Sequence, residues 1–511
     1  MNARSLRRLS IAVPLALLLV GTGFALGRQG ARGFRLFQSV FDVVAAEAAD
    51  SLEADSIYTT AARGLVAALD DPFAQLFNRR EFADFNRNAL GNRYGGIGLR
   101  IARIRGGVQV WRVIPGGPAE AAGVQRGDRI VQVGDSVITG WTTDRVANLL
   151  TGTPGTPVPV TLTRHGTGER YTLDLTRAVI SLSSVPFAAL LDGGIGYLSV
   201  QRFSDRSAAD VAGAIQRLQA AGATGYVLDL RGNPGGSLEQ AVQMTNLFVA
   251  AGRLIVEVRG RRTDDSLRGV RPPLLDERLP LVVLVDSASA SASEILAGAL
   301  QDHDRALVVG TTTFGKGVVQ GAYNLPDGWV LKLTTGRWYT PVGRPLHRSR
   351  ADSARTQRPV FRSLGGRAIL GGGGVTPDVI VFAETLATTA QTLGRLLNVR
   401  ATGVSDVLDG YAGELEAGVR PDFVPAPAWR GELLRRLRAA GMLLPDTLDA
   451  AAGAYLDRLL EGRVTGFALS DSAAFVRGVP RDVQLNRAAA LLHGTRTQRE
   501  LLAAATIRER G

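Results

Sequence analysis

From residue 195 onward, short apolar segments alternate with segments of helical periodicity, and this alternation constrains the fold more than any other feature. Strands are expected at 195–200, 226–230 and 281–285, and helices at 210–221, 238–250 and 294–301. Strands that alternate with helices form layered α/β domains, in which helices cover a sheet. We therefore expect an α/β layered domain over residues 179–383.

The rest of the chain has three regions of different character. Residues 29–93 carry apolar side chains at helical spacing and are predicted to be helical. Residues 94–178 contain clustered glycines, β-prone runs and two short helices near 119–122 and 143–150, which predicts a small β-domain. Alanine, leucine and arginine at helical spacing predict a helical extension over 384–511. The expected fold class is therefore multidomain α+β.

The first 28 residues have the pattern of an export signal. Arg4, Arg7 and Arg8 precede an uncharged, mostly apolar run over 11–26. At ~1.5 Å per residue, this run is shorter than the ~30 Å hydrocarbon core of a bilayer. A bacterial-type signal is favoured, either cleaved near Ala25 or kept as an inner-membrane anchor. We expect the rest of the chain to work outside the cytoplasmic membrane, in the periplasm or cell envelope.

Composition excludes several kinds of site and partner. There is no cysteine, which excludes disulfides and thiolate nucleophiles, and the four histidines lack metal-binding spacing, so no metal site is expected. The net charge of +12 comes mainly from arginine spread along the whole chain, whereas nucleic-acid-binding proteins cluster their basic residues. We therefore expect no nucleic-acid partner, although a weak attraction to anionic lipids stays open.

Lysine is rare in this chain, and its two positions stand out. Of the 59 lysine and arginine residues, only Lys316 and Lys332 are lysines. Arginine stays protonated at any working pH, whereas a buried lysine can lose its proton and act as a base. Lys316 lies between two glycines and is a candidate base. Lys332 lies in an apolar strand, and we expect its amine to reach solvent or a carboxylate.

A run of alternating serine and alanine, residues 287–293, precedes Lys316. Ser291 in this run lies 25 residues before Lys316, and Ser293 directly precedes Glu294. A serine and a neutral lysine can act as nucleophile and base without a histidine. By itself, Ser291 followed three residues later by Glu294 is the pattern of a helix capping box. The coincidence with Lys316 favours a nucleophile in this run.

Two glycine-rich segments are suited to present backbone N–H groups. Residues 229–236, Asp-Leu-Arg-Gly-Asn-Pro-Gly-Gly, leave a buried strand and turn into a helix, as an oxyanion hole requires. Gly95, Gly96, Ile97, Gly98 and Leu99 precede a strand. A loop of this kind can form a nest that holds the terminal carboxylate of a peptide.

Residues 94–178 resemble a PDZ domain. Four segments occur in the order and spacing typical of that domain: Gly-Gly-Ile-Gly-Leu from Gly95, Val-Ile-Pro-Gly-Gly-Pro-Ala from Val113, Ala-Gly-Val from Ala122, and Gly-Asp-Arg-Ile from Gly127. The resemblance implies that the segment binds the C-termini of protein or peptide partners.

Residues 34–382 resemble the carboxyl-terminal processing proteases, also called tail-specific proteases. The resemblance rests on Leu-Arg-Gly-Asn-Pro-Gly-Gly, Ser-Ala-Ser-Ala-Ser-Glu and Phe-Gly-Lys-Gly-Val-Val-Gln, and on the order of export signal, helical region, PDZ domain and catalytic domain. It implies a serine peptidase with a ClpP/crotonase-like catalytic domain, an acyl-enzyme intermediate and no cofactor. The basic stretch over 347–367 is longer than is usual in the family, and the helical extension is not part of the shared core.

Carried onto this sequence, the family pattern implies particular roles. Ser291 would be the nucleophile, Lys316 the base, and Gln320 the residue that orients the lysine amine. Oxyanion donors would be the backbone N–H of Ala292 and one from Gly235 or Gly236, with the positive end of the helix dipole beside them.

Two other interpretations stay open at this stage. The chain could be a binding protein with an inactive protease fold, but the intact Ser291, Lys316 and Gln320 argue against that. An α/β acyl-CoA hydratase-like enzyme would share the glycine-turn oxyanion hole, but it explains neither the export signal nor the PDZ segment. Protein substrates with free C-termini are thus the expected partners, and homo-oligomers through the N-terminal helices or the extension are a further expectation.

Overall fold

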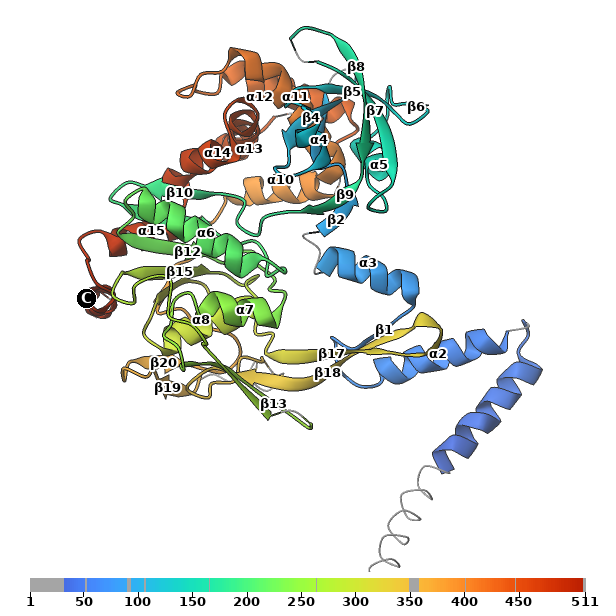
Figure 1. Cartoon of the computed structure of the whole chain (residues 1–511), viewed down its shortest axis with the longest axis vertical. Helices are drawn as coiled ribbons and strands as arrows, with labels where there is room; N and C mark the ends of the chain where they lie inside the picture. The colour runs from blue at the N-terminus through green and yellow to red at the C-terminus, as the bar shows by residue number, and fades with distance from the viewer. Residues whose placement is uncertain are drawn as a thin grey trace, which may run out of the picture. The chain divides into compact units, whose positions relative to one another are not determined.

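The computed structural model (Figure 1) describes most of the chain beyond the N-terminus. The described residues are 32–50, 53–89, 93–104, 107–164, 166–262, 264–348, 358–399, 401–445 and 447–508. They form two compact units, Met1–Arg80 with Gln320–Thr334, and Glu81–Val319 with Thr335–Gly511. The export signal predicted over 1–28 lies outside the described residues. Among the helices of the described ranges, none has the length and apolarity needed to cross a membrane.

The first unit contains helices and one strand pairing that the sequence did not predict. After a helix over 32–47 and α2 (Ala54–Ala67), β1 (Gln75–Phe77) pairs antiparallel with β18 (Val330–Tyr339). The prediction of helix throughout 29–93 is therefore wrong at β1. Its hydrogen-bonding partner lies far along the chain, and local periodicity cannot reveal a ladder formed with a distant strand.

The small β-domain has the predicted strands and both predicted helices. Its sheet has the order β3-β4-β5-β7-β8, with β6 beside β5, so β3 is an edge strand. The strands are β3 (Leu99–Ile104), β4 (Gly107–Val113), β5 (Arg129–Val133), β6 (Ser136–Val137), β7 (Pro157–Thr163) and β8 (Arg170–Thr176). Helices α4 (Pro118–Ala121) and α5 (Thr143–Leu150) accompany them, and Val108, Val146 and Val160 are fully buried in the core.

A second sheet forms the centre of the α/β domain predicted over residues 179–383, in the order β10-β11-β12-β15-β16-β21. Its strands are β10 (Ala188–Leu191), β11 (Ile195–Ser199), β12 (Gly225–Asp229), β15 (Leu281–Val285), β16 (Leu307–Gly310) and β21 (Val379–Ile380). β11 to β21 run parallel, and β10 is antiparallel at the edge. Every residue of β12 and β15 is buried, as expected for parallel strands covered on both faces.

Helices from distant parts of the chain cover the two faces of this sheet. Leu228, Val283 and Val285 belong to the core formed with α6 (Ser207–Ala220), α7 (Leu238–Thr245) and α8 (Ala292–Asp302). On the other face, Val227, Val282 and Leu284 pack with α15 (Val483–Leu492) and α16 (Gln498–Arg508) of the extension. The last helices of the extension therefore complete the hydrophobic core of the α/β domain.

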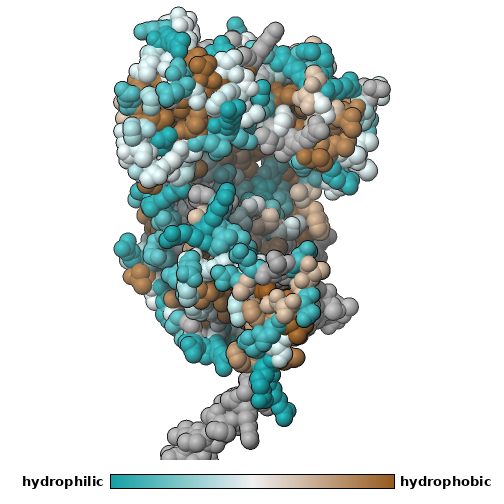
Figure 2. All heavy atoms as spheres, turned by 90° about the vertical axis from the view of Figure 1, so that its right-hand side faces the viewer, coloured by the Kyte–Doolittle hydropathy of each residue, from teal (hydrophilic) through white to brown (hydrophobic). Residues whose placement is uncertain are grey.

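The earlier helices of the extension pack on the β-domain. The helices on the β-domain are α10 (Thr388–Asn398), α11 (Ala401–Leu415), α12 (Pro427–Ala439) and α13 (Ala450–Ala468). Their apolar cluster includes Ala102 and Trp111 of the β-domain, and Trp111 stacks on Phe467 with ring centroids 5.5 Å apart. α14 (Asp471–Gly478) instead places Phe475 against Phe187 and Tyr197 beside the central sheet. On the face shown in Figure 2, hydrophobic side chains lie in several separate groups with hydrophilic side chains between them.

The remaining strands pair outside these two sheets. β13 (Leu254–Gly260) pairs with β14 (Asp264–Arg268) and with the end of β18, and β17 (Val318–Asn324) pairs with β18. β2 (Arg93–Gly96) pairs with β9 (Ala178–Ser181), and β19 (Val360–Arg362) with β20 (Ala368–Leu370).

Candidate active site

The two segments expected to carry catalysis meet at one edge of the central sheet. β12 and β15 are parallel neighbours, so the glycine turn after β12 and the serine run after β15 emerge side by side. The Gly232 N–H donates to both carboxylate oxygens of Asp286, at 3.0 and 3.1 Å. The Ala290 N–H donates to the carbonyl oxygen of Asn233 at 3.0 Å. Hydrogen bonds thus hold the turn and the serine run together.

The structure distinguishes the serines of the run from one another. Ser287 is exposed. The buried Ser289 donates its hydroxyl to the Leu230 carbonyl at 2.8 Å, and the buried Ser293 donates its hydroxyl to the Asn233 carbonyl at 3.0 Å. These two hydroxyls hold the serine run to the glycine turn.

Ser291 differs from its neighbours in its backbone. It is the N-cap of α8 and has φ 59° and ψ −114°, a conformation that residues other than glycine rarely adopt. Backbone strain of this kind costs on the order of 1–3 kcal/mol and is concentrated at functional sites. Of the four serines, Ser291 is therefore the one whose geometry best fits a nucleophile.

The glycine turn packs directly against this strained serine. Gly235 has φ +95°, and a methyl group added to it would lie 2.8 Å from Ser291 Cβ and 2.9 Å from the Ala292 nitrogen. Only glycine fits such an approach. The Gly235 N–H itself donates to Asn233 Oδ1 at 2.9 Å. Of the two N–H groups in this turn that were predicted as oxyanion donors, Gly236 is therefore the better candidate. The second predicted donor is the Ala292 N–H at the start of α8.

A single buried carboxylate joins the candidate nucleophile to the candidate base. Glu294 is fully buried and accepts the backbone N–H groups of Ser291 at 2.8 Å, Gly315 at 2.7 Å and Lys316 at 2.8 Å. It also accepts the Thr313 hydroxyl at 2.6 Å. Burial raises the pKa of Glu294, and the four donors oppose that rise because they stabilise the anion. The glutamate half of the capping box forms, and it also reaches the lysine segment.

The two lysines lie in different environments. Lys316 is half-buried, and desolvation lowers its pKa below the ordinary lysine value, against the negative charge of Glu294. That direction favours the neutral amine that a base needs. The amine of Lys332 lies over the ring of Phe77, 5.5 Å from its centroid. The sequence predicted that this amine reaches solvent or a carboxylate, and the structure adds a contact with an aromatic ring.

The sequence matches two family patterns and many curated proteins. The pattern of peptidase family S41 matches residues 194–353, and that of the PDZ domain matches residues 109–164. The carboxy-terminal processing protease CtpA of Bacillus subtilis is 32% identical over 342 residues, 66% of this chain and 72% of that protein. The carboxy-terminal-processing protease of Bartonella bacilliformis is 33% identical over 351 residues, 68% of this chain and 74% of that protein.

The chain belongs to the carboxy-terminal processing proteases. It is accordingly a serine-type peptidase with a PDZ domain. Among solved structures, the photosystem II D1 C-terminal processing protease is 31% identical, with 72% of this chain and 92% of that chain covered and a TM-score of 0.38.

Gln320, the residue predicted to orient the lysine amine, makes a hydrogen bond that the sequence did not predict. Gln320 lies on β17 in the first unit, where its amide nitrogen donates to the Phe73 carbonyl at 2.8 Å. Its proposed role in orienting the Lys316 amine stays a prediction.

The predicted carboxylate-binding loop of the PDZ domain is shorter than the sequence indicated. Gly95 and Gly96 are strand residues of β2, paired with Val179 and Ala178, so the expectation that they belong to an open loop is wrong. The missing side chain allows the backbone to pack closely here, since a methyl group on Gly95 would lie 2.0 Å from the Gly152 carbonyl oxygen. The loop proper is Ile97–Gly98, with Gly98 at φ +82°, and Leu99 begins β3.

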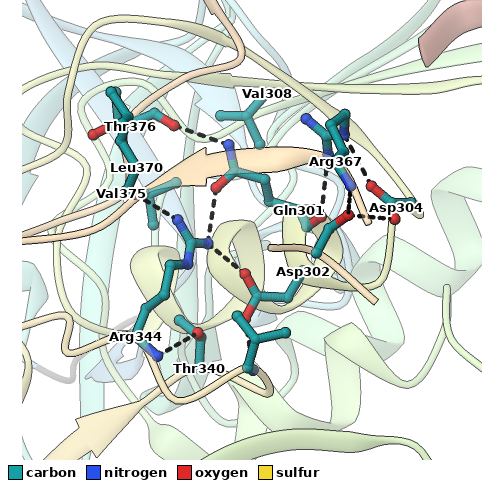
Figure 3. A network of polar contacts seen from close by, with 12 residues as sticks. Gln301, Asp302, Asp304, Val308, Thr340, Arg344, Arg367, Leu370, Val375 and Thr376 are labelled. Atoms are coloured by element: carbon teal, nitrogen blue, oxygen red, sulfur yellow. Dashed lines mark hydrogen bonds and ion pairs between the residues drawn. The ribbon is translucent and has the colours of Figure 1, made fainter. Parts of the chain in front are cut away.

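A buried polar network anchors the far end of α8, the helix that begins beside Ser291 (Figure 3). Arg344, 1% exposed, donates to Asp302 at 2.6 Å and to Gln301 at 2.8 Å at the end of this helix. Arg367 donates to Asp304 at 2.9 Å and pairs with Asp378. α8 is thus fixed at both ends, by Glu294 near its start and by two arginines near its end.

Sequence reasoning missed two features of this site. Glu294 was identified as a helix cap, but its contacts to residues 313–316 depend on a loop that follows the next strand. The second is an ion pair between Arg231 in the glycine turn and Asp482 in the helical extension. The motif around Arg231 marks its importance, but no sequence signal indicates its partner.

Proposed function

We propose that this protease is an exported endopeptidase in which Ser291 is the nucleophile and Lys316 is the base. The observation that carries the proposal is the Glu294 carboxylate, which accepts the backbone N–H groups of both residues. The strained backbone at Ser291 and the lowered pKa of Lys316 support the same assignment.

In the proposed reaction, neutral Lys316 takes the hydroxyl proton of Ser291 as the serine oxygen attacks the scissile carbonyl. The oxyanion that forms is stabilised by the N–H groups of Ala292 and Gly236, beside the N-terminus of α8. The lysine then gives its proton to the leaving amine, and an acyl-enzyme remains. Lys316, neutral again, activates a water molecule that hydrolyses the acyl-enzyme and frees Ser291.

We further propose that the PDZ domain selects substrates by their C-termini. β3 is an edge strand of its sheet, and α11 of the extension packs against its end around Arg103, so an extended peptide would add to β3 by main-chain hydrogen bonds on the stretch nearer Leu99. Its carboxylate would lie at Ile97–Leu99, at the start of β3. Ser291 of the protease would then cleave the captured chain at a peptide bond upstream of its bound C-terminus.

The proposed location is outside the cytoplasmic membrane, on the strength of residues 1–28. Arg4, Arg7 and Arg8 before an apolar run support export, with the segment either cleaved or kept as an anchor. Fusion of residues 1–28 to a reporter that is active only outside the cytoplasm tests this proposal, and a silent reporter would refute it.

The decisive experiment compares the fragment lacking residues 1–28 with its Ser291→Ala form. Each is incubated with an unstructured protein that ends in an apolar residue. We expect cleavage by the parent and retention without cleavage by the variant. Equal cleavage by both would overturn the assignment of Ser291, and retention without cleavage by both would support a binding protein instead.

A further inference from the structure

Arg231 occupies a bridging position between the catalytic sheet and the helical extension. It follows β12 and lies near the start of the glycine turn, whose Gly235 packs against Ser291. On the sheet side, its guanidinium donates to the buried Asp229 at 2.6 to 3.1 Å, and its backbone N–H donates to the same carboxylate at 2.9 Å. Asp229 is held in turn by the Tyr197 hydroxyl at 2.7 Å.

On the other side, Arg231 is held by the extension. Its two terminal nitrogens donate to the two carboxylate oxygens of Asp482, at 2.8 and 2.7 Å, in the paired geometry that is strongest for arginine. One of these nitrogens also donates to Gln484 Oε1 at 3.1 Å. The side chains of Arg231 and Asp482 are only 19% and 25% exposed, so solvent screens this pair less than it screens a surface pair.

Asp482 is itself fixed in place. It is the N-cap of α15 and accepts the Leu485 N–H at 3.0 Å. The helix behind it is held by buried apolar residues, among them Leu485, Ala488 and Leu491, which cover one face of the central sheet. Burial, the largest single influence, disfavours the charged form of Asp482, but the hydrogen bond and positive charge of Arg231 together with the backbone N–H groups of Leu485 and Gln484 outweigh it, so the pKa of Asp482 is lowered. The carboxylate is therefore charged at neutral pH.

We propose that Asp482 is a positioning residue of the protease, which acts through Arg231 to hold the glycine turn in the geometry that Ser291 needs. The extension thereby sets the rate of the chemical step rather than substrate binding. A shift of about 1 Å in a group that positions a reactive centre can lower turnover ten- to a hundredfold. The proposal rests on the proposed role of Ser291 and extends it to a part of the chain far from the catalytic motifs.

Replacing Asp482 with asparagine separates this role from helix capping. Asparagine caps helices as well as aspartate does, so α15 keeps its N-cap. The charge is lost, however, and the new amide NH₂ would face an arginine N–H. Asp449 provides a matched control, because it caps α13 in the same way, accepts the Ala452 N–H at 2.8 Å and is exposed.

The test uses the full chain in detergent and a quenched fluorescent peptide that ends in an apolar residue. For Asp482→Asn we expect kcat to fall about tenfold or more with KM within about twofold, and labelling of Ser291 by a fluorophosphonate to slow by a similar factor. Asp449→Asn should match the parent in both measurements. An unchanged kcat, or a loss confined to KM, would overturn the proposal.

A second pair of variants shows whether the effect passes through Arg231. Arg231→Lys keeps a positive charge beside Asp229 but loses the paired geometry. In that background, Asp482→Asn should have little further effect, whereas two independent losses that multiply would contradict the proposal. If Asp482→Asn does not fold, Asp482→Ser keeps a capping side chain and gives the same comparison. Ser291→Ala is measured alongside: its retained activity would refute the proposed nucleophile, whereas an inactive Ser291→Ala with an unaffected Asp482→Asn would refute only this positioning role.

Discussion

The two glycine-rich segments of this protease look alike in sequence but differ in structure. At the PDZ domain, Gly95 and Gly96 belong to a strand, and their missing side chains make room for the Gly152 backbone carbonyl and the Tyr94 ring, respectively. At the catalytic domain, Gly235 leaves the strand, adopts a positive φ and makes room for Ser291. Glycine marks close packing in both places. Its neighbours decide whether that packing holds a sheet together or shapes a reactive centre.

Removal of the serine hydroxyl should have the largest effect. Ser291→Ala is expected to lower kcat by several orders of magnitude, ~10⁴–10⁶-fold by analogy with other serine nucleophiles. Ser287→Ala is the matched control, because Ser287 lies in the same run and is exposed. Ser289→Ala and Ser293→Ala should retain much of the activity but lose about 1 kcal/mol of stability, because each removes a buried hydrogen bond. Peptide turnover and thermal unfolding measure the two effects, and full activity in Ser291→Ala would contradict the assignment.

The next largest effect is expected at the candidate base. Lys316→Arg should be as inactive as Lys316→Ala, because arginine cannot become neutral. In the parent protease, desolvation lowers the pKa of Lys316, so activity should rise with pH through an apparent pKa below the ~10.4 of free lysine. A pH profile of kcat for the parent, measured beside the two variants, checks both statements. Turnover by the arginine variant would remove Lys316 from the mechanism.

Adding one methyl group at each glycine segment tests the comparison directly. Gly235→Ala should lower kcat by about 10²–10³-fold, since the methyl group would displace Ser291 or the Ala292 N–H that stabilises the oxyanion. Gly95→Ala should instead destabilise the PDZ domain through its contact with the Gly152 carbonyl, and leave labelling of Ser291 by a fluorophosphonate nearly unchanged. The comparison fails if both variants slow that labelling equally.

The smallest effect on cleavage is expected from amidation of the substrate's C-terminus. Peptides with a free, apolar C-terminus should be cut more readily than their amidated forms, by about tenfold or less in kcat/KM, because amidation removes the charge that the N–H groups of Ile97–Leu99 would hold. Deleting residues 94–177 should abolish this preference, with a rate change of either sign, since the domain can tether substrate or cover the site. If free and amidated peptides are cut equally and the deletion changes nothing, the PDZ domain is only a spacer.

Much of the fold follows from local patterns. Continuous apolar runs predicted β12 and β15 because both faces of a central strand are buried, and helical spacing predicted α5 and α8 to within a few residues. β1 was missed because its three residues carry no period, and its strand pairing is with the distant β18. Motif order and spacing placed Ser291 and Lys316 as candidates, but four serines in one run share the same local chemistry.

The sequence by itself determined which kinds of side chain this protease has available: a rare lysine between two glycines, a serine run and no cysteine. Only the tertiary structure decided how they are used. It strained Ser291, tied Ser289 and Ser293 to carbonyls, and placed Glu294 between two segments separated by a strand. It also brought Asp482 to Arg231. Hydrogen bonds and close contacts depend on distance in space, and residues 231 and 482 come within bonding distance only after the helical extension packs on the sheet.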